Sequence, residues 1–127
     1  MEKEFIPFEL AVKLKELGFD EKCLGYYIKN SSLWCNWLDV KFNDDPSNDK
    51  EDFVADAPLY QQAFRWFREK YKLHHVIHQF NFKKDTDKEY LAEVDKIEDG
   101  FEYFRTYEEC EHFCLDKLIE IVKTKSE

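Results

Sequence analysis

Three cations and one amide recur at helical spacing near the middle of the chain, at Gln61, Arg65, Arg68 and Lys72. On a helix these side chains would fall within about 60° of one another. Cationic groups in one stripe can grip a phosphate or a carboxylate through charge-assisted hydrogen bonds. The alternative is the solvated face of an amphipathic helix, where surface charges contribute little. We therefore name this stripe as the candidate ligand-binding site, with an anionic small molecule as its ligand.

Thiols and imidazoles can hold a metal ion, but their spacing here argues against it. Cys110 and Cys114 are one helical turn apart, whereas His112 would point about 200° away from Cys110. His74 and His78 would lie about 13 Å apart on one strand face, because each residue advances ~3.3 Å. That separation is too long for one metal ion. We predict no metal site and no cofactor, and we expect free cysteines that pack as small hydrophobic side chains.

The sequence also gives little support to a catalytic site. Glu108, His112 and Asp116 recur one turn apart, and a carboxylate beside an imidazole can tune a general base. Solvated helix faces produce such runs routinely. No serine sits in a glycine elbow after a strand, and Cys35 has no neighbouring base in the sequence to activate its thiol. With three glycines, the chain can form neither a phosphate-binding glycine loop nor a dinucleotide fingerprint. The sequence therefore gives no support to an enzyme.

The net charge of −9 is unevenly distributed. Residues 43–56 and 85–102 are acidic, whereas residues 57–84 carry six cations against Glu69 alone, a local charge of +5. The aspartates of the first acidic segment lack the spacing and the glycine of a calcium-binding loop. A negative chain is a poor direct binder of nucleic acid, because phosphate contacts supply most of that affinity. The cationic segment would nevertheless attract small anions.

Hydrophobic periodicity predicts three helices and two β-hairpins that would position these groups. The helices are expected at residues 7–17, 58–72 and 107–123, and the hairpin strands at 23–29, 33–42, 74–82 and 89–97. Residues 101–104 could add a short fifth strand. The order α-β-β-α-β-β-α predicts an α+β fold, with three helices packed on an antiparallel sheet of four to five strands. With 127 residues, we expect a single domain over residues 1–127.

Local signals fix the ends and the buried faces of these helices. Pro7 suits the start of the first helix, and Gly18 its left-handed end. Thr106 and Glu109 have the spacing of a capping box. The predicted core face of the middle helix consists of Tyr60, Phe64, Phe67 and Tyr71, extended by Leu59, Ala63 and Trp66. The predicted buried face of the last helix consists of Tyr107, Cys110, Cys114, Leu118 and Ile121.

The longest apolar runs span only a few residues, which is too short to cross a membrane. The first five residues, MEKEF, are charged where a signal peptide needs an apolar core. We therefore expect a cytoplasmic protein that does not enter a membrane.

Three blocks of the sequence have a familiar pattern: FIPFELAVKLKELGFDEKCLGYY, APLYQQAFRWFREKYKL and TYEECEHFCLDKLIEIVK. Together they resemble a group of short, uncharacterised proteins carried by bacteriophages and prophages, especially in Bacteroidetes. The blocks cover nearly half the chain, and YQQAFRWFREKY is the most specific part. The resemblance implies a phage origin and a bacterial host cell, and it implies no activity.

Two functions follow as hypotheses. Aromatic residues make up 17% of the chain, charge is segregated and catalytic motifs are absent, which favours a non-enzymatic interaction or inhibitor module that binds a host or phage macromolecule. In a variant of this idea, the acidic segments mimic nucleic acid. The alternative is a small-ligand binder that holds an anionic metabolite or nucleotide on Arg65 and Arg68, helped by Gln61 and Lys72. A homodimer would suit either function.

Overall fold

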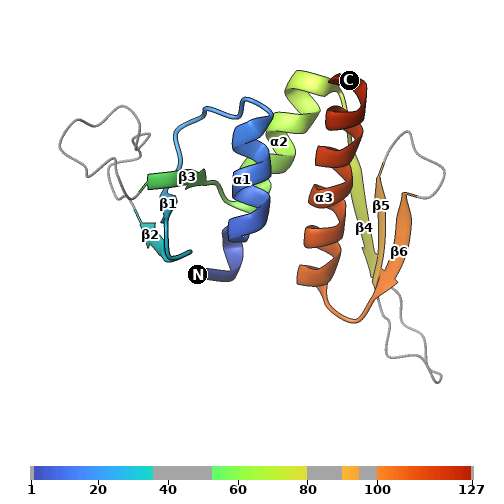
Figure 1. Ribbon diagram of the computed structural model, residues 1–127. Coiled ribbons are helices and arrows are strands. Elements are labelled where there is room, and N and C mark those ends of the chain that lie inside the picture. The colour runs from blue at the N-terminus through green and yellow to red at the C-terminus, as the bar shows by residue number, and fades with distance from the viewer. Residues whose placement is uncertain (1, 36–52, 80–89, 95–99, 127) are drawn as a thin grey trace. The chain divides into compact units, whose positions relative to one another are not determined.

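The computed structural model describes residues 2–35, 53–79, 90–94 and 100–126. They form one 3₁₀ helix, three α-helices and six β-strands (Figure 1). In chain order these are η1 (Glu2–Glu4), α1 (Phe8–Glu16), β1 (Gly25–Ile28), β2 (Leu33–Cys35), β3 (Phe53–Ala57), α2 (Tyr60–Tyr71), β4 (His75–Gln79), β5 (Tyr90–Val94), β6 (Phe101–Phe104) and α3 (Tyr107–Ser126). The fold is α+β, as predicted. Residues 43–52 of the first acidic segment, and residues 85–89 and 95–99 of the second, lie outside the described residues.

The chain divides into two compact units, Met1–Gln62 and Ala63–Glu127. Each unit contains one antiparallel sheet of three strands in the described part of the chain. The predicted single sheet of four to five strands is therefore not matched, because the strands separate into two sheets. Helix α2 runs across the boundary between the units. The expectation of a single domain over residues 1–127 stays a prediction.

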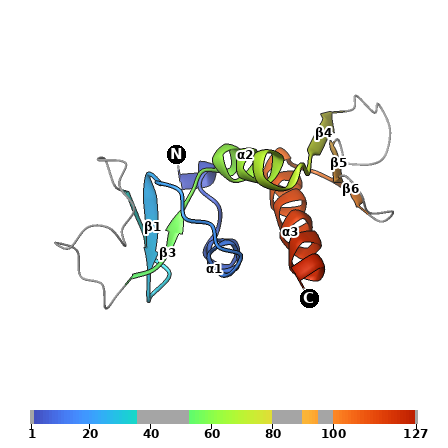
Figure 2. The same cartoon turned by 90° about the horizontal axis from the view of Figure 1, so that it is seen from above.

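The sheet of the N-terminal unit has the strand order β2-β1-β3, and α1 packs against β3 (Figure 2). The predicted hairpin of β1 and β2 is confirmed, with Tyr26 opposite Trp34. Strand β3 was not predicted. Its sequence, FVADA, carries a weak strand signal, since alanine and aspartate are depleted in strands. Pairing with β1, which places Tyr27 opposite Ala55, forms this strand in spite of its composition.

The core of the N-terminal unit lies between α1 and its sheet. Leu10 and Leu14, one turn apart on α1, are buried. Gly18 adopts the predicted left-handed conformation after the helix, with φ at 95°. The hydroxyl of Tyr27 donates a buried hydrogen bond to the carbonyl oxygen of Ile6, with an O···O distance of 2.7 Å. This bond ties the segment before α1 to the first strand of the sheet.

Helix α2 has the predicted aromatic core face, on which Phe64 and Phe67 are fully buried. It ends at Tyr71, because Lys72 turns into the left-handed region with φ at 58°. The N–H of Leu73 then donates to the carbonyl oxygen of Phe67, with an N···O distance of 3.2 Å. This bond satisfies one carbonyl at the end of the helix.

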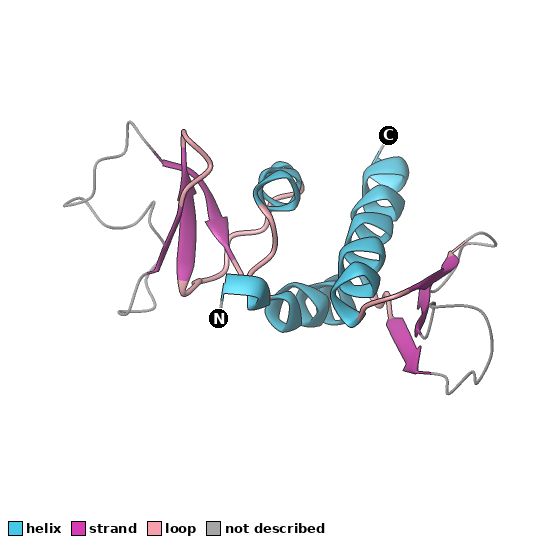
Figure 3. Ribbon diagram, turned by 90° about the horizontal axis from the view of Figure 1, so that it is seen from below, coloured by secondary structure: helices cyan, strands magenta, loops and turns pink. Residues whose placement is uncertain are grey.

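The sheet of the C-terminal unit has the order β4-β5-β6, and α3 packs against all three strands (Figure 3). On the central strand β5, Leu91 pairs with His78 of β4 on one side and with Tyr103 of β6 on the other. Residues 101–104 form the short strand that the sequence suggested. On the face toward α3, the rings of Phe104 and Phe113 lie 5.4 Å apart between centroids.

Helix α3 begins at the predicted capping box. The N–H of Glu109 donates to the hydroxyl oxygen of Thr106 at 3.2 Å, and that hydroxyl lies 3.1 Å from the Glu109 carboxylate. Cys110, Cys114 and Leu118 are buried as predicted. The prediction that Tyr107 is buried is wrong, since this side chain is 42% exposed. It is the first residue of the helix, and its ring lies 6.2 Å between centroids from the ring of Tyr90, the first residue of β5.

Candidate binding surfaces

The predicted cationic stripe falls on α2 and on the residue after it. Gln61, Arg65 and Lys72 are exposed, and Arg68 is half-buried. Gln61 belongs to the N-terminal unit, whereas the three cations belong to the C-terminal unit. Among the described residues, neither arginine forms an ion pair. The cations of the C-terminal unit therefore keep the solvent access that an anion site needs.

The imidazole next to this stripe does not add to its charge. The ring of His75 stacks on the ring of Phe64, with centroids 3.7 Å apart. Burial, then the charge of Arg68, then His74, lower the pKa of His75 to about 4. His75 is therefore neutral at physiological pH.

The cations also have a structural role at this end of α2. Arg68 and Lys70 stand in the last turn, where positive charge is favoured by the partial negative charge of the helix end. The ammonium group of Lys70 lies 5.1 Å from the centre of the Trp66 ring, which adds a cation–π contact. Such contacts account for basic residues here without any ligand.

The buried thiols of Cys110 and Cys114 are unreactive at neutral pH. Burial first, with nearby carboxylates second, raises the pKa of Cys110 to about 11. Burial first, with Cys110 second, raises the pKa of Cys114 to about 12. Both groups are therefore protonated at neutral pH and are poor nucleophiles and metal ligands. In the part of the chain that the structure describes, no three side chains of His, Cys, Asp or Glu are grouped to hold a metal ion.

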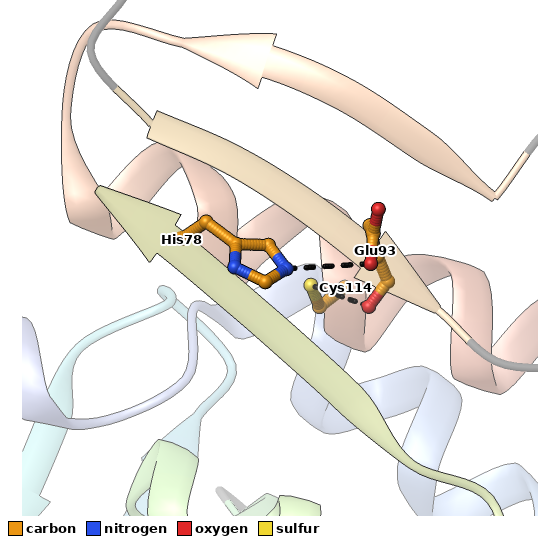
Figure 4. Close-up of polar contacts among 3 residues, drawn as sticks. All are labelled: His78, Glu93 and Cys114. Carbon is orange, nitrogen blue, oxygen red and sulfur yellow. Dashed lines mark hydrogen bonds and ion pairs between the residues drawn. The ribbon is translucent and has the colours of Figure 1, made fainter. Parts of the chain in front are cut away.

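The histidines of β4 fall on opposite faces of the sheet. His75 faces Phe64, whereas the Nε2 of exposed His78 lies 3.4 Å from the Glu93 carboxylate on β5 (Figure 4). The thiol of Cys114, on α3, lies 4.0 Å from the backbone carbonyl oxygen of Glu93. His78 and Glu93 thus form an exposed polar pair on the sheet face opposite to α3.

The same sheet face carries a surface that the sequence analysis missed. Three of its apolar side chains are exposed: Val76 by 46%, Phe101 by 55% and Tyr103 by 40%. On this face Leu91, which is only 8% exposed, lies between His78 and Tyr103, and Glu93 lies between Val76 and Phe101. We call this surface the open sheet face, and it consists of Val76, His78, Leu91, Glu93, Phe101 and Tyr103. The alternation in FEYF was the signal that could have revealed it, because residues two apart in a strand share a face.

A hollow of about 520 Å³ lies beside β6, at the start of α3. We call it the β6–α3 hollow, and it is lined by Glu102, Tyr103, Phe104, Arg105, Glu109 and Phe113. Its lining combines aromatic rings with two carboxylates and one guanidinium group.

The N-terminal unit also exposes an aromatic side chain. Trp34 of β2 is 53% exposed and pairs with half-buried Tyr26 on β1. Among residues 3–34 and 53–62 it is the one exposed aromatic ring, so a substitution of Trp34 is a suitable control.

Within the described residues, no helix combines the length and the apolar character needed to cross a membrane. Comparisons with protein-family models, with curated proteins and with solved structures give no match for this chain.

Proposed function

We propose that this protein is a non-enzymatic binding module, and that its open sheet face binds a protein partner. The resemblance of its three sequence blocks to phage proteins supports a host or phage protein as that partner. The proposed setting is the cytoplasm of the bacterium that carries the phage.

One observation carries this proposal: Val76, Phe101 and Tyr103 are all exposed on one face of the sheet. Apolar surface gathered on one face costs free energy in water, and on single chains it commonly marks an interaction site. Burial contributes roughly 25 cal/mol per Å² of apolar area. Aromatic rings are frequent anchors of such contacts, because they bury a large area with few rotatable bonds.

The test is capture of a partner by the tagged full chain from lysate of an infected host, compared across variants. We expect the double variant Phe101→Ser with Tyr103→Ser to lose a partner that the wild type binds saturably. Trp34→Ser, which removes an exposed ring from the other unit, should keep it. Melting curves confirm that the variants are folded. Equal affinity of both variants for that partner, or no saturable partner at all, contradicts the proposal.

A second function, the small-ligand binder, is favoured by a different observation. Lys72 holds a left-handed backbone conformation, which costs free energy for a residue with a side chain. Strained residues of this kind cluster at ligand-binding sites. We propose that Arg65, Arg68 and Lys72 hold an anionic metabolite or nucleotide there.

A thermal-shift screen with nucleotides and sugar phosphates tests this second function, because a ligand stabilises the folded state by mass action. Arg65→Glu should abolish any shift in melting temperature. Lys123→Glu, an exposed charge reversal on α3, should retain it. If no anion raises the melting temperature of the wild type, this function is wrong.

A further inference from the structure

Strand β6 is the last strand of its sheet among the described residues, and one hydrogen bond fixes the direction of its backbone groups. The N–H of Val94 donates to the carbonyl oxygen of Gly100, with an N···O distance of 2.7 Å. In an antiparallel ladder, hydrogen-bonded pairs alternate with pairs that are not bonded. In the register of β5 and β6, Glu102 and Phe104 are therefore the next residues whose backbone groups point to β5.

The backbone groups of Phe101 and Tyr103 consequently point away from β5, along the outer edge of the sheet. An independent contact agrees with this direction. The N–H of Tyr103 donates to Oε1 of the Glu102 side chain, with an N···O distance of 3.2 Å. A carboxylate oxygen thus occupies the place that a carbonyl oxygen of an added strand would take.

The β6–α3 hollow lies along this edge. A groove between an edge strand and a helix is the geometry in which an extended peptide adds to a sheet as a further strand. Main-chain hydrogen bonds then supply affinity, and pockets for alternate side chains supply specificity. Here the aromatic rings of Phe104 and Phe113 offer an apolar wall for one such side chain.

The charge around the hollow selects the occupant. Its lining carries two carboxylates, at Glu102 and Glu109, against the guanidinium group of Arg105. A second copy of this chain would bring the same acidic edge and a net charge of −9. A strand with lysine or arginine is favoured instead, because opposite charges across neighbouring strands attract and like charges repel.

We infer that the outer edge of β6, together with the β6–α3 hollow, is a docking site for an extended segment of a partner protein that alternates apolar and cationic residues. This inference rests on the proposed function and names the chemistry of its partner. On docking, a carbonyl oxygen of the added strand replaces the Glu102 carboxylate at the Tyr103 N–H. The released carboxylate then pairs with a cation of the partner.

The probe is a synthetic six-residue peptide of alternating valine and lysine, titrated into the isotope-labelled full chain and followed by amide NMR signals. We expect saturable shifts at the amides of Phe101 and Tyr103. The matched peptide with glutamate in place of lysine should not bind. Glu102→Lys should reverse this preference between the two peptides. If neither peptide shifts those amides at millimolar concentration, or if Glu102→Lys leaves the preference unchanged, the inference is overturned.

Substitution of the edge donor separates this inference from the broader proposal. Tyr103→Pro removes the outward N–H and no bond to β5, which an edge strand tolerates, whereas Tyr103→Ala removes only the ring. We expect Tyr103→Pro to bind the lysine peptide about tenfold more weakly than Tyr103→Ala does. A captured partner that is lost equally with both variants overturns the docking edge and leaves the open sheet face intact. Analytical ultracentrifugation tests whether the chain forms a dimer. A dimer that Tyr103→Pro dissociates would show that the edge binds a second copy of this chain, and it would overturn the inference as well.

Discussion

The imidazole of His75 stacks on the phenyl ring of Phe64, with centroids 3.7 Å apart and an angle of 19° between the ring planes. The pair joins α2 to the first strand of the C-terminal sheet. A stacked, desolvated imidazole is stable only in its neutral form, because burial and the nearby charge of Arg68 both oppose protonation. The contact therefore links the stability of this unit to pH.

Acid should destabilise the protein through His75. Its pKa falls from 6.5 to about 4 on folding, so the unfolded state takes up the proton first as the pH is lowered. The stabilisation is complete above pH 6.5 and is lost as the pH falls from there toward about 4. His75→Phe, which keeps a stacked ring that cannot titrate, should flatten the melting temperature over this window. If the melting temperatures of the wild type and of His75→Phe fall equally from neutral to acidic pH, His75 does not cause the loss of stability in acid.

Gly25→Ala should destabilise the N-terminal unit by about 1–3 kcal/mol through overpacking. An added Cβ would lie 2.9 Å from Cε1 of Phe5 and 3.1 Å from the carbonyl oxygen of Trp34. Phe5 is buried and cannot move aside cheaply. Urea denaturation measures the loss, with the exposed Lys29→Ala as a control expected to change little. An unchanged urea midpoint for Gly25→Ala would show that the neighbours of the added Cβ move aside without loss of stability, which would contradict this prediction.

Tyr27→Phe should cost about 1–3 kcal/mol of unfolding free energy, because it deprives the buried Ile6 carbonyl of its donor. The substitution keeps the ring that packs edge-on against Phe8. Tyr71→Phe, which also removes only a hydroxyl, is the matched control. Denaturant midpoints that fall by the same amount in both variants would argue against a special role for the Tyr27 hydroxyl.

Lys72→Gly should raise stability by about 1 kcal/mol, because glycine adopts the left-handed conformation without steric cost. The same residue change inside the last turn of α2, Lys70→Gly, should lower stability by a similar amount. Melting temperatures of the two variants give the signs directly. If the second proposed function is right, Lys72→Gly also weakens anion binding while it stabilises the fold. A lower melting temperature for Lys72→Gly would contradict this prediction. It would mean that the Lys72 side chain stabilises the folded state by more than the left-handed backbone conformation destabilises it.

The sequence by itself determined the helices and their ends, because those signals are local. Gly18 after the first helix and the pair of Thr106 and Glu109 before the last one act within one turn of chain. The aromatic spacing around Phe64 and Phe67 likewise required only helical geometry to predict the buried face of α2. The hairpin of β1 and β2 was also predictable, since its strands are neighbours in sequence.

The tertiary structure alone decided which strands share a sheet and which faces stay open. Strand β3 forms because it pairs with β1, not because of its own composition. Phe101, Tyr103 and Phe104 are all aromatic residues of one strand, but only the packing of α3 decides that Phe104 is half-buried while Phe101 and Tyr103 are exposed. Strand pairing and the packing of a helix on a sheet join residues that are far apart in the chain. The residue pattern of a single strand does not indicate which distant strand or helix will contact it.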